Sequence, residues 1–176
     1  MQDSPVRGSE LKQTSPAAEI HVGIAELKVS GQPDRLITMG LGSCVGLTLY
    51  DPLTKVGGLL HIMLPDSTLF NQVTKPAKFA DLGIPLMIAE IKRRGGRVNN
   101  LQAKIAGGAQ MFSGSNEKFM LNIGERNIVT TRLILRGMGI RVLAEEVGGS
   151  RGRTMILDTV SGQVMIRTVG TPIKVI

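Results

Sequence analysis

Two apolar runs separated by a short polar break constrain the fold more than any other feature of the sequence. The runs are VGLTLY at 45–50 and VGGLLHIML at 56–64, and the break between them reads Asp51-Pro52-Leu53-Thr54. Apolar runs rich in strand-forming residues, interrupted by Asp and Pro, are typical of a β-hairpin. We therefore expect two adjacent antiparallel strands here.

The length of the break predicts which residues face each other across the hairpin. If 51–54 form a four-residue loop, Tyr50 pairs with Lys55, and Cys44 pairs with His61. Paired residues on one face have Cβ atoms about 4.5–5.5 Å apart, so the imidazole would reach the sulfur. A slip of one residue would instead place the two side chains on opposite faces.

The two faces of the predicted hairpin differ in character. One face carries large apolar residues and is predicted to be core: Val45, Leu47, Leu49, Leu60, Ile62 and Leu64. The face of Cys44 and His61 also carries Gly46 and Gly57. Because glycine has no side chain, we expect open space above these strands for a substrate chain.

A Cys–His pair is a frequent arrangement in nucleophilic catalysis. A free thiol has a pKa of about 8.5, so a neighbouring imidazole is needed to supply thiolate at neutral pH. A third group must fix the imidazole tautomer, and the Thr38 hydroxyl is close upstream. The competing interpretation is that Cys44, the single cysteine, is a small buried hydrophobe. The residues alone leave both interpretations open.

The backbone before the cysteine has features that suit acyl transfer. Gly40 and Gly42 permit a bend just upstream of Cys44. Backbone N–H groups at Gly42, Ser43 and Cys44 are therefore candidate donors to a developing oxyanion. Two ligands, Cys44 and His61, are too few for a structural zinc site, so we expect no metal and no cofactor.

The rest of the pattern predicts an α+β layered fold with two helices on one side. Helical spacing covers 78–94 and 125–136, each followed by glycine. Further strands are expected at 20–24, 35–39, 102–106, 140–147, 153–159 and 163–169. Short turns at Gly148-Gly149 and Ser161-Gly162 favour antiparallel or mixed pairing.

Length and composition narrow the class of protein. The 176 residues suit a flexible polar tail at 1–18 and one domain at 19–176. Without a long apolar run or a secretory signal, and with a single cysteine, we expect a cytoplasmic protein with no membrane insertion. The formal charge of +7 favours an acidic partner, and 3% aromatic residues argue against nucleic acid.

Other features carry weaker predictions. His21 is expected on the surface or at a sheet edge, since no second catalytic group accompanies it. The glycine-rich loop at 107–117 is either a plain turn or a rim of a substrate cleft or partner surface. Arg151 and Arg153 are expected at a hairpin turn, facing solvent or the acidic residues of a partner.

Five blocks of the sequence together resemble the CheD family, the chemoreceptor glutamine deamidases of bacterial chemotaxis. They are TMGLGSCVGLTLYDP, GGLLHIMLPDS, KIAGGAQMF, NIGERN and EEVGGSRGRTMILDTVSG, and they run in family order between about Ile20 and Val169. The sequence departs from the family at its extended N-terminal tail and at Gly46, where alanine is more common. Neither departure touches the proposed site.

The resemblance implies a fold, an activity and partners. The fold would be a layered α/β/β sandwich, and Cys44, His61 and Thr38 would hydrolyse receptor glutamines to glutamate with release of ammonia. Methyl-accepting chemotaxis receptors would be the substrate and a CheC-type phosphatase a candidate partner. Two other functions stay open at this point: an adaptor that regulates such a phosphatase, and a thiol hydrolase with another substrate. We expect a monomer.

Overall fold

The computed structural model describes residues 16–110 and 122–176, which form ten strands and two α-helices. The strands are β1 (Glu19–His21), β2 (Leu27–Gly31), β3 (Arg35–Leu41), β4 (Val45–Asp51), β5 (Val56–Ile62), β6 (Gln102–Gly107), β7 (Arg141–Val147), β8 (Arg153–Asp158), β9 (Val164–Thr168) and β10 (Lys174–Val175). The helices are α1 (Ala80–Arg93) and α2 (Ile123–Gly137), and 3-10 turns cover Pro76–Lys78 and Val98–Asn100.

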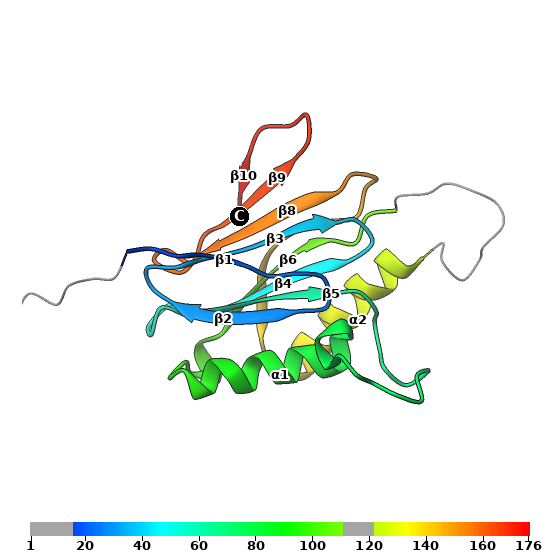
Figure 1. The fold of residues 1–176 in the computed structure, drawn as a ribbon, viewed down its shortest axis with the longest axis horizontal. Coiled ribbons are helices and arrows are strands. Elements are labelled where there is room, and N and C mark those ends of the chain that lie inside the picture. Colours follow the sequence, from blue (N-terminus) through cyan, green and yellow to red (C-terminus); the bar gives the residue numbers. More distant parts are fainter. Residues whose placement is uncertain (1–15, 111–121) are drawn as a thin grey trace, which may run out of the picture.

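The strands form two five-stranded sheets stacked face to face (Figure 1). Both helices cover one of these sheets, on the face turned away from the other sheet, so the covered sheet is the middle layer of three. The outer sheet has the order β1-β3-β8-β9-β10, and the middle sheet has the order β2-β5-β4-β6-β7. Pairing is mixed, since β1–β3 and β6–β7 are parallel and the other pairs are antiparallel. The predicted α/β/β sandwich, with both helices on one side, is confirmed.

Each interface between layers has its own apolar core. The helices bury apolar residues spaced three or four apart, such as Ile84, Met87 and Ile91 of α1, against the middle sheet. A second cluster lies between the two sheets and includes Leu36, Leu41 and residues of β8 and β9. Strand β4 is buried on both faces because it contributes to both interfaces.

The predicted hairpin forms, but its register is wrong by two residues. Asp51 pairs with Val56, which makes 52–55 the loop, and His61 lies opposite Gly46 instead of Cys44. An even shift leaves every side chain on its predicted face, because side chains alternate with a period of two. Val45, Leu47, Leu49, Leu60 and Ile62 accordingly belong to the core under the helices, as predicted. The prediction is wrong for Leu64, which is only half-buried and lies outside this cluster because β5 ends at Ile62.

The space predicted above Gly46 and Gly57 is filled by the outer sheet. A Cβ atom at Gly46 would lie 2.8 Å from side-chain atoms of both Leu41 and Met155, and one at Gly57 would lie 2.8 Å from Leu157. These glycines let the two sheets approach closely. The expectation of a substrate channel over them is wrong, because this hairpin face packs against a second sheet.

The strands β2 and β10 were not predicted, and the predicted turn at Gly148-Gly149 connects two different sheets. Strand β2 pairs with β5, and β10 pairs with β9. The turn at Ser161-Gly162 joins β8 and β9 as a true hairpin. The segment after Gly148 does not, because β7 lies in the middle sheet and β8 in the outer sheet.

Three such crossings between sheets gather at one end of the sandwich. Residues 22–26 connect β1 to β2, residues 42–44 connect β3 to β4, and residues 148–152 connect β7 to β8. The pairing of Leu41 with Arg153 and of Val45 with both Ile62 and Gly107 places these strand ends together. This crossing end holds Thr38, Cys44 and His61.

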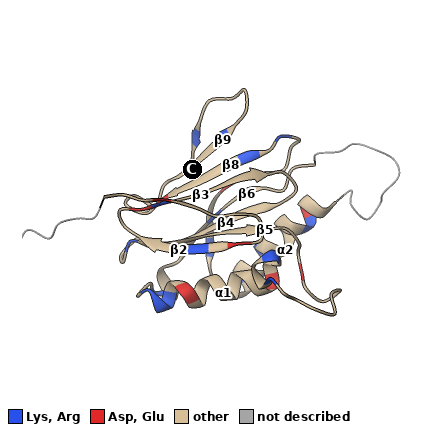
Figure 2. Cartoon of the chain, viewed as in Figure 1, with Lys and Arg blue, Asp and Glu red and all other residues tan. Residues whose placement is uncertain are grey.

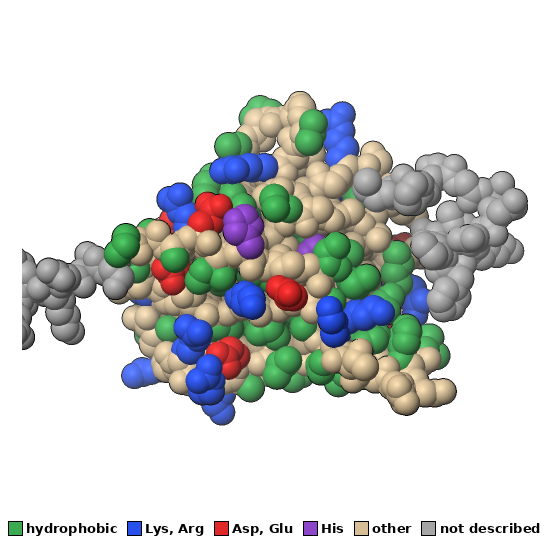
Figure 3. All heavy atoms as spheres, in the orientation of Figure 1, with side chains coloured by type: hydrophobic (Ala, Val, Ile, Leu, Met, Phe, Trp, Pro, Cys, Tyr) green, Lys and Arg blue, Asp and Glu red, His purple; other side chains and the backbone are tan. Residues whose placement is uncertain are grey.

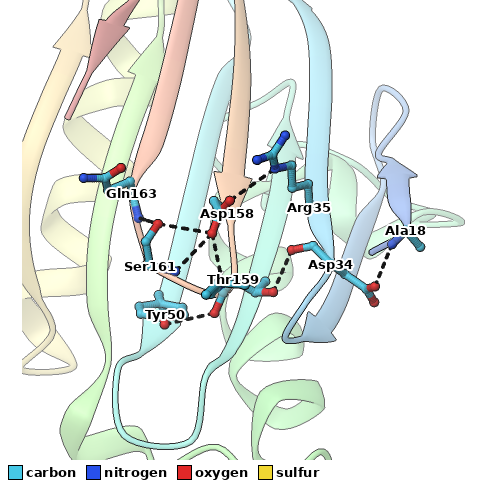
Figure 4. A network of polar contacts seen from close by, with 9 residues as sticks. Ala18, Asp34, Arg35, Tyr50, Asp158, Thr159, Ser161 and Gln163 are labelled. Carbon is cyan, nitrogen blue, oxygen red and sulfur yellow. Dashed lines mark hydrogen bonds and ion pairs between the residues drawn. The ribbon is translucent and has the colours of Figure 1, made fainter. Parts of the chain in front are cut away.

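The opposite end is held by a polar network around Tyr50 (Figure 4). The Tyr50 hydroxyl, on the middle sheet, donates to the Thr159 carbonyl in the turn of the outer sheet at 3.0 Å. The ring lies against Gly162, where a Cβ would come within 2.3 Å of it. The Thr159 hydroxyl in turn donates to the Asp34 carbonyl. A buried hydrogen bond therefore joins the two sheets here.

Most of the N-terminal stretch predicted to be a flexible tail lies outside the described residues. Ala18, its last residue, is anchored at both backbone groups. Its N–H donates to the Asp34 carboxylate at 3.0 Å, and its carbonyl accepts from the Arg35 N–H at 2.8 Å. Ordered backbone therefore begins no later than Ala18.

Replacing Tyr50 with phenylalanine tests the link between the sheets at this end. The Thr159 carbonyl would lose a buried donor, so we expect the free energy of unfolding in urea to fall by about 1–2 kcal/mol. Arg35→Ala is the comparison, because the Arg35–Asp158 ion pair is half exposed and should contribute about 0–1 kcal/mol. Equal losses in the two variants would contradict this account.

Candidate functional site

Thr38, Cys44 and His61 come from both sheets and from the crossing between them. Thr38 lies in β3 of the outer sheet, His61 in β5 of the middle sheet, and Cys44 in the segment that connects them. His61 is fully buried and Cys44 half-buried, and Cys44 packs against the cluster between the sheets. All three side chains thus face the space between the sheets at the crossing end.

The hydrogen bonds of Thr38 determine the tautomer of His61. The Thr38 hydroxyl donates its single proton to the Val22 carbonyl at 2.8 Å, and its oxygen lies 2.8 Å from His61 Nδ1. Nδ1 must therefore carry the proton and donate to Thr38. This leaves the lone pair on Nε2, which is buried and has no hydrogen-bond partner within the described ranges.

The protonation states follow from burial. Burial lowers the pKa of His61 to about 4 from an ordinary 6.5. Burial also raises the pKa of the Cys44 thiol, an effect that its own backbone N–H partly offsets. At neutral pH the resting site therefore holds a neutral thiol and a neutral imidazole whose Nε2 is unprotonated.

The segment 42–44 is fixed through its carbonyl groups. The Gly42 carbonyl accepts from the Ala109 N–H and the Cys44 carbonyl from the Gly108 N–H, both at 2.7 Å. The Ser43 carbonyl accepts from the Asn127 side-chain amide at 3.0 Å. Three successive carbonyls are thus held by groups of the β6 loop and α2.

The N–H groups of this segment differ in availability. The Gly42 N–H already donates to the Gly40 carbonyl at 2.9 Å. Within the part of the chain that the structure describes, the N–H groups of Ser43 and Cys44 donate to no other residue. Of the predicted oxyanion donors, Ser43 and Cys44 are therefore available, and Gly42 is occupied.

Asn127 is a site residue that the sequence reasoning missed. It is fully buried in α2, and its side-chain amide donates to the Met63 carbonyl at 2.9 Å as well as to Ser43. One amide thereby ties the cysteine segment to the end of the histidine strand. The available signal was a polar residue on the apolar face of the predicted helix, beside Ile128 and Thr131.

The glycine pair at 107–108 is required by close approach to the cysteine segment. Gly107 has φ +100° and Gly108 has φ +65°, and a Cβ at Gly107 would lie 2.3 Å from the Cys44 carbonyl oxygen. The first four residues of the predicted loop therefore buttress the site. Residues 111–117 of that loop lie outside the described residues, so its role as a rim stays a prediction.

The other residues singled out in the sequence, His21, Arg151 and Arg153, differ in their exposure. His21 is exposed on the edge strand β1, as predicted. Arg151 is exposed, but Arg153 is only 8% exposed, so the expectation of a solvent-facing side chain is wrong for Arg153. The described ranges contain no cluster of three or more His, Cys, Asp or Glu suited to a metal ion. They also contain no helix long and apolar enough to cross a membrane.

Comparison with known proteins identifies the family. The family model "CheD chemotactic sensory transduction" matches residues 63–168. A protein of Desulforamulus reducens named "Probable chemoreceptor glutamine deamidase CheD" is 72% identical over 159 residues, 90% of this chain and 96% of that one. The chain belongs to the CheD family. A Clostridium tetani protein of the same printed name is 53% identical over 161 residues, 92% of this chain and 98% of that one.

The relatives cover the proposed site of this CheD-family protein. The family model begins two residues after His61, but any continuous span of 159 of the 176 residues includes positions 38 to 61. A solved structure, the Bacillus licheniformis hypothetical protein YfiH, shares 16% identity and a TM-score of 0.42 over 68% of this chain and 49% of that one. That similarity is too low to support an argument.

Gly107→Ala tests whether the glycine pair supports the cysteine segment. The new Cβ would combine a left-handed backbone strain with a collision against the Cys44 carbonyl, so we expect the free energy of unfolding to fall by roughly 2–6 kcal/mol. Gly139→Ala is the matched control, since Gly139 has φ +70° but open space around it, and it should cost about 1–2 kcal/mol. Equal losses in urea unfolding would refute the contact.

The pH dependence of stability tests the burial of His61. Its folded pKa of about 4 lies below the ordinary 6.5, so only the unfolded chain binds a proton between these values. Stability is fully present above pH 6.5 and is lost as pH falls toward 4, by about 3 kcal/mol from this group. As pH falls from 7 to 4, the free energy of unfolding of the wild type should therefore drop by that amount relative to the free energy of unfolding of His61→Gln. A constant difference from pH 7 to 4 would show that His61 titrates normally.

Proposed function

We propose that this CheD-family protein is a chemoreceptor glutamine deamidase that uses Cys44 as nucleophile. The observation that carries the proposal is the buried Thr38–His61 hydrogen bond, which leaves a basic nitrogen without a partner at the end of the sandwich that also holds a half-buried thiol. The printed names of the relatives supply the substrate class, a glutamine side chain of a chemoreceptor.

The acylation step begins with transfer of the thiol proton to His61 Nε2. The Cys44 sulfur then forms a bond to the carboxamide carbon, and the N–H groups of Ser43 and Cys44 donate to the oxyanion. Nε2 returns the proton to the departing nitrogen, which leaves as ammonia. A thioester remains on Cys44.

The second half of the reaction repeats the proton transfers with water. Neutral His61 removes a proton from a water molecule that attacks the thioester carbon. The thiolate leaves and recovers the proton from Nε2, and glutamate is released. Throughout, Thr38 accepts a hydrogen bond from Nδ1–H, so that Nε2 is the nitrogen that takes up and returns each proton.

The resting geometry requires one adjustment before this chemistry. His61 lies opposite Gly46, so Cys44 occupies the diagonal position on the same face, and the sulfur makes no hydrogen bond to Nε2. Diagonal neighbours are farther apart than direct partners. Catalytic hydrogen bonds often tighten only when substrate binds, so we expect the thiol to turn toward Nε2 as the carboxamide enters.

Substitution of the proposed nucleophile and of the proposed base tests the assignment. With a chemoreceptor cytoplasmic fragment as substrate, we expect Cys44→Ala and His61→Ala to abolish deamidation, measured by mass spectrometry as conversion of glutamine to glutamate. Losses should exceed the roughly 10²–10⁴-fold typical of one proton-transfer group. Full activity of Cys44→Ala would eliminate the mechanism.

Thr38→Val separates an orienting role from a structural one. It removes the acceptor for Nδ1–H but keeps the side-chain shape. Because Thr38 only orients His61 in the proposed mechanism, we expect activity to fall without being abolished. Thr48→Val is the control, because Thr48 is also buried in a strand and its hydroxyl donates to the Lys104 carbonyl. The control should keep wild-type activity. Equal losses in both variants would assign Thr38 a packing role only.

Regulation of a CheC-type phosphatase is the second function implied by the family resemblance. It is compatible with the first, because an inactive Cys44→Ala protein would retain its surface. Pull-down of a CheC-type protein with this variant separates binding from chemistry. A monomeric state is likewise a prediction, to be measured by light scattering.

A further inference from the structure

Arg153 is the most unusual charged residue outside the proposed catalytic site. Only 8% of it is exposed, although guanidinium groups are rarely buried without firm partners. Its Nη2 lies 3.8 Å from Glu146 Oε1, its Nη1 is 3.4 Å from the Arg151 carbonyl, and its Nε has no partner within the described ranges. The protein therefore leaves this positive charge incompletely compensated.

Glu146 cannot neutralise Arg153 alone because it is shared. Its carboxylate also contacts the Lys174 ammonium, and this is the closer of its two ion pairs. The surroundings add further positive charge from Arg151 and Arg167. Basic positions on β8, β9 and β10 lie around this part of the outer sheet (Figure 2).

Arg153 lines two adjoining clefts at the crossing end of the sandwich. One, of about 390 Å³, lies between the 148–152 crossing and the β9–β10 hairpin and is lined also by Glu146 and Lys174. The other, of about 510 Å³, is lined also by Gly40 and Arg167. Together their charged lining residues are four cations and one carboxylate: Arg151, Arg153, Arg167, Lys174 and Glu146.

The clefts are connected to the cysteine segment through backbone contacts. Arg153 pairs with Leu41, the last residue of β3 before residues 42–44. The Gly148 N–H donates to the Gly107 carbonyl, and the Gln110 N–H donates to the Gly149 carbonyl. The same 107–110 segment holds Gly42 and Cys44. The clefts therefore lie at the same end of the sandwich as the proposed nucleophile and are joined to it by backbone hydrogen bonds.

We propose that the Arg153 clefts bind a carboxylate side chain of the acidic protein segment that carries the target glutamine. An arginine presents planar donors that match a carboxylate. A bound carboxylate would also supply negative charge that Glu146 provides only in part, because Glu146 pairs with Lys174 as well. This inference rests on the proposed function for the identity of the segment. It adds a specificity determinant that reads a residue near the glutamine.

Binding measured without turnover tests the clefts. On the Cys44→Ala background, we expect Arg153→Gln to raise the Kd for a chemoreceptor cytoplasmic fragment by about 10–100-fold. Arg35→Gln is the matched control, because Arg35 lies on the same two paired strands at the opposite end, and it should change Kd by less than about twofold. Equal effects of the two variants would overturn the proposal.

A double-mutant cycle identifies the carboxylate. Each Asp or Glu of the fragment near the target glutamine is replaced by its amide, and one replacement should weaken binding as Arg153→Gln does, with no further loss when combined. Fully additive losses for every position, or no binding of the original fragment, would refute the site. If Arg153→Gln fails to fold by circular dichroism, the cycle is run on Arg153→Lys, which keeps the charge but loses the planar donors.

The two proposals fail in different ways. Coupling between Arg153 and a carboxylate without deamidation by the wild-type enzyme would support the clefts and refute the proposed function. Deamidation without such coupling would support the function and refute the clefts.

Discussion

The hydrogen bond between Thr38 and His61 is the interaction on which the site depends, because it crosses from one sheet to the other. Thr38 belongs to the outer sheet and His61 to the middle sheet, so their 2.8 Å contact exists only when the sheets stack in one relative position. Gly46 and Gly57 allow that close approach, since the side chains of Leu41, Met155 and Leu157 occupy the space above them. The packing of the sandwich and the chemistry of the imidazole therefore share one geometric requirement.

At the same end of the molecule, the carbonyl groups and the N–H groups of residues 42–44 have different roles. The carbonyls of 42–44 are all held by the 107–110 segment or by Asn127, while the N–H groups of Ser43 and Cys44 donate to no other residue within the described ranges. A segment fixed through its acceptors presents its donors without mobility, which is the arrangement that stabilises a developing negative charge. Because His61 and Cys44 are both neutral at rest, charge appears in the site only during reaction.

Local pattern was sufficient to predict most elements and the faces of the central hairpin. The helices were predicted within a few residues, and alternation assigned Leu47 and Leu60 to the core correctly. The register of Cys44 and His61 was wrong because loop length was inferred, and Asp51 extends β4 by pairing with Val56. The connection after Gly148 was misread because a turn within a hairpin and a crossing between sheets contain the same residue types. Asn127 and Arg153 could not be assigned, since their importance comes from contacts between segments far apart in the sequence.

Charge is distributed differently around the site than over the rest of the described surface. The chain carries seven more basic than acidic side chains, yet on the face shown in Figure 3 the two signs are interspersed. A net positive charge attracts an acidic partner at long range, whereas selection requires a charge held in one place. Arg153 meets that condition because burial fixes its position and Glu146 only partly compensates it. Since the 107–110 segment contacts both the 148–152 crossing and the cysteine segment, a partner held at Arg153 would be positioned relative to Cys44 by rigid backbone.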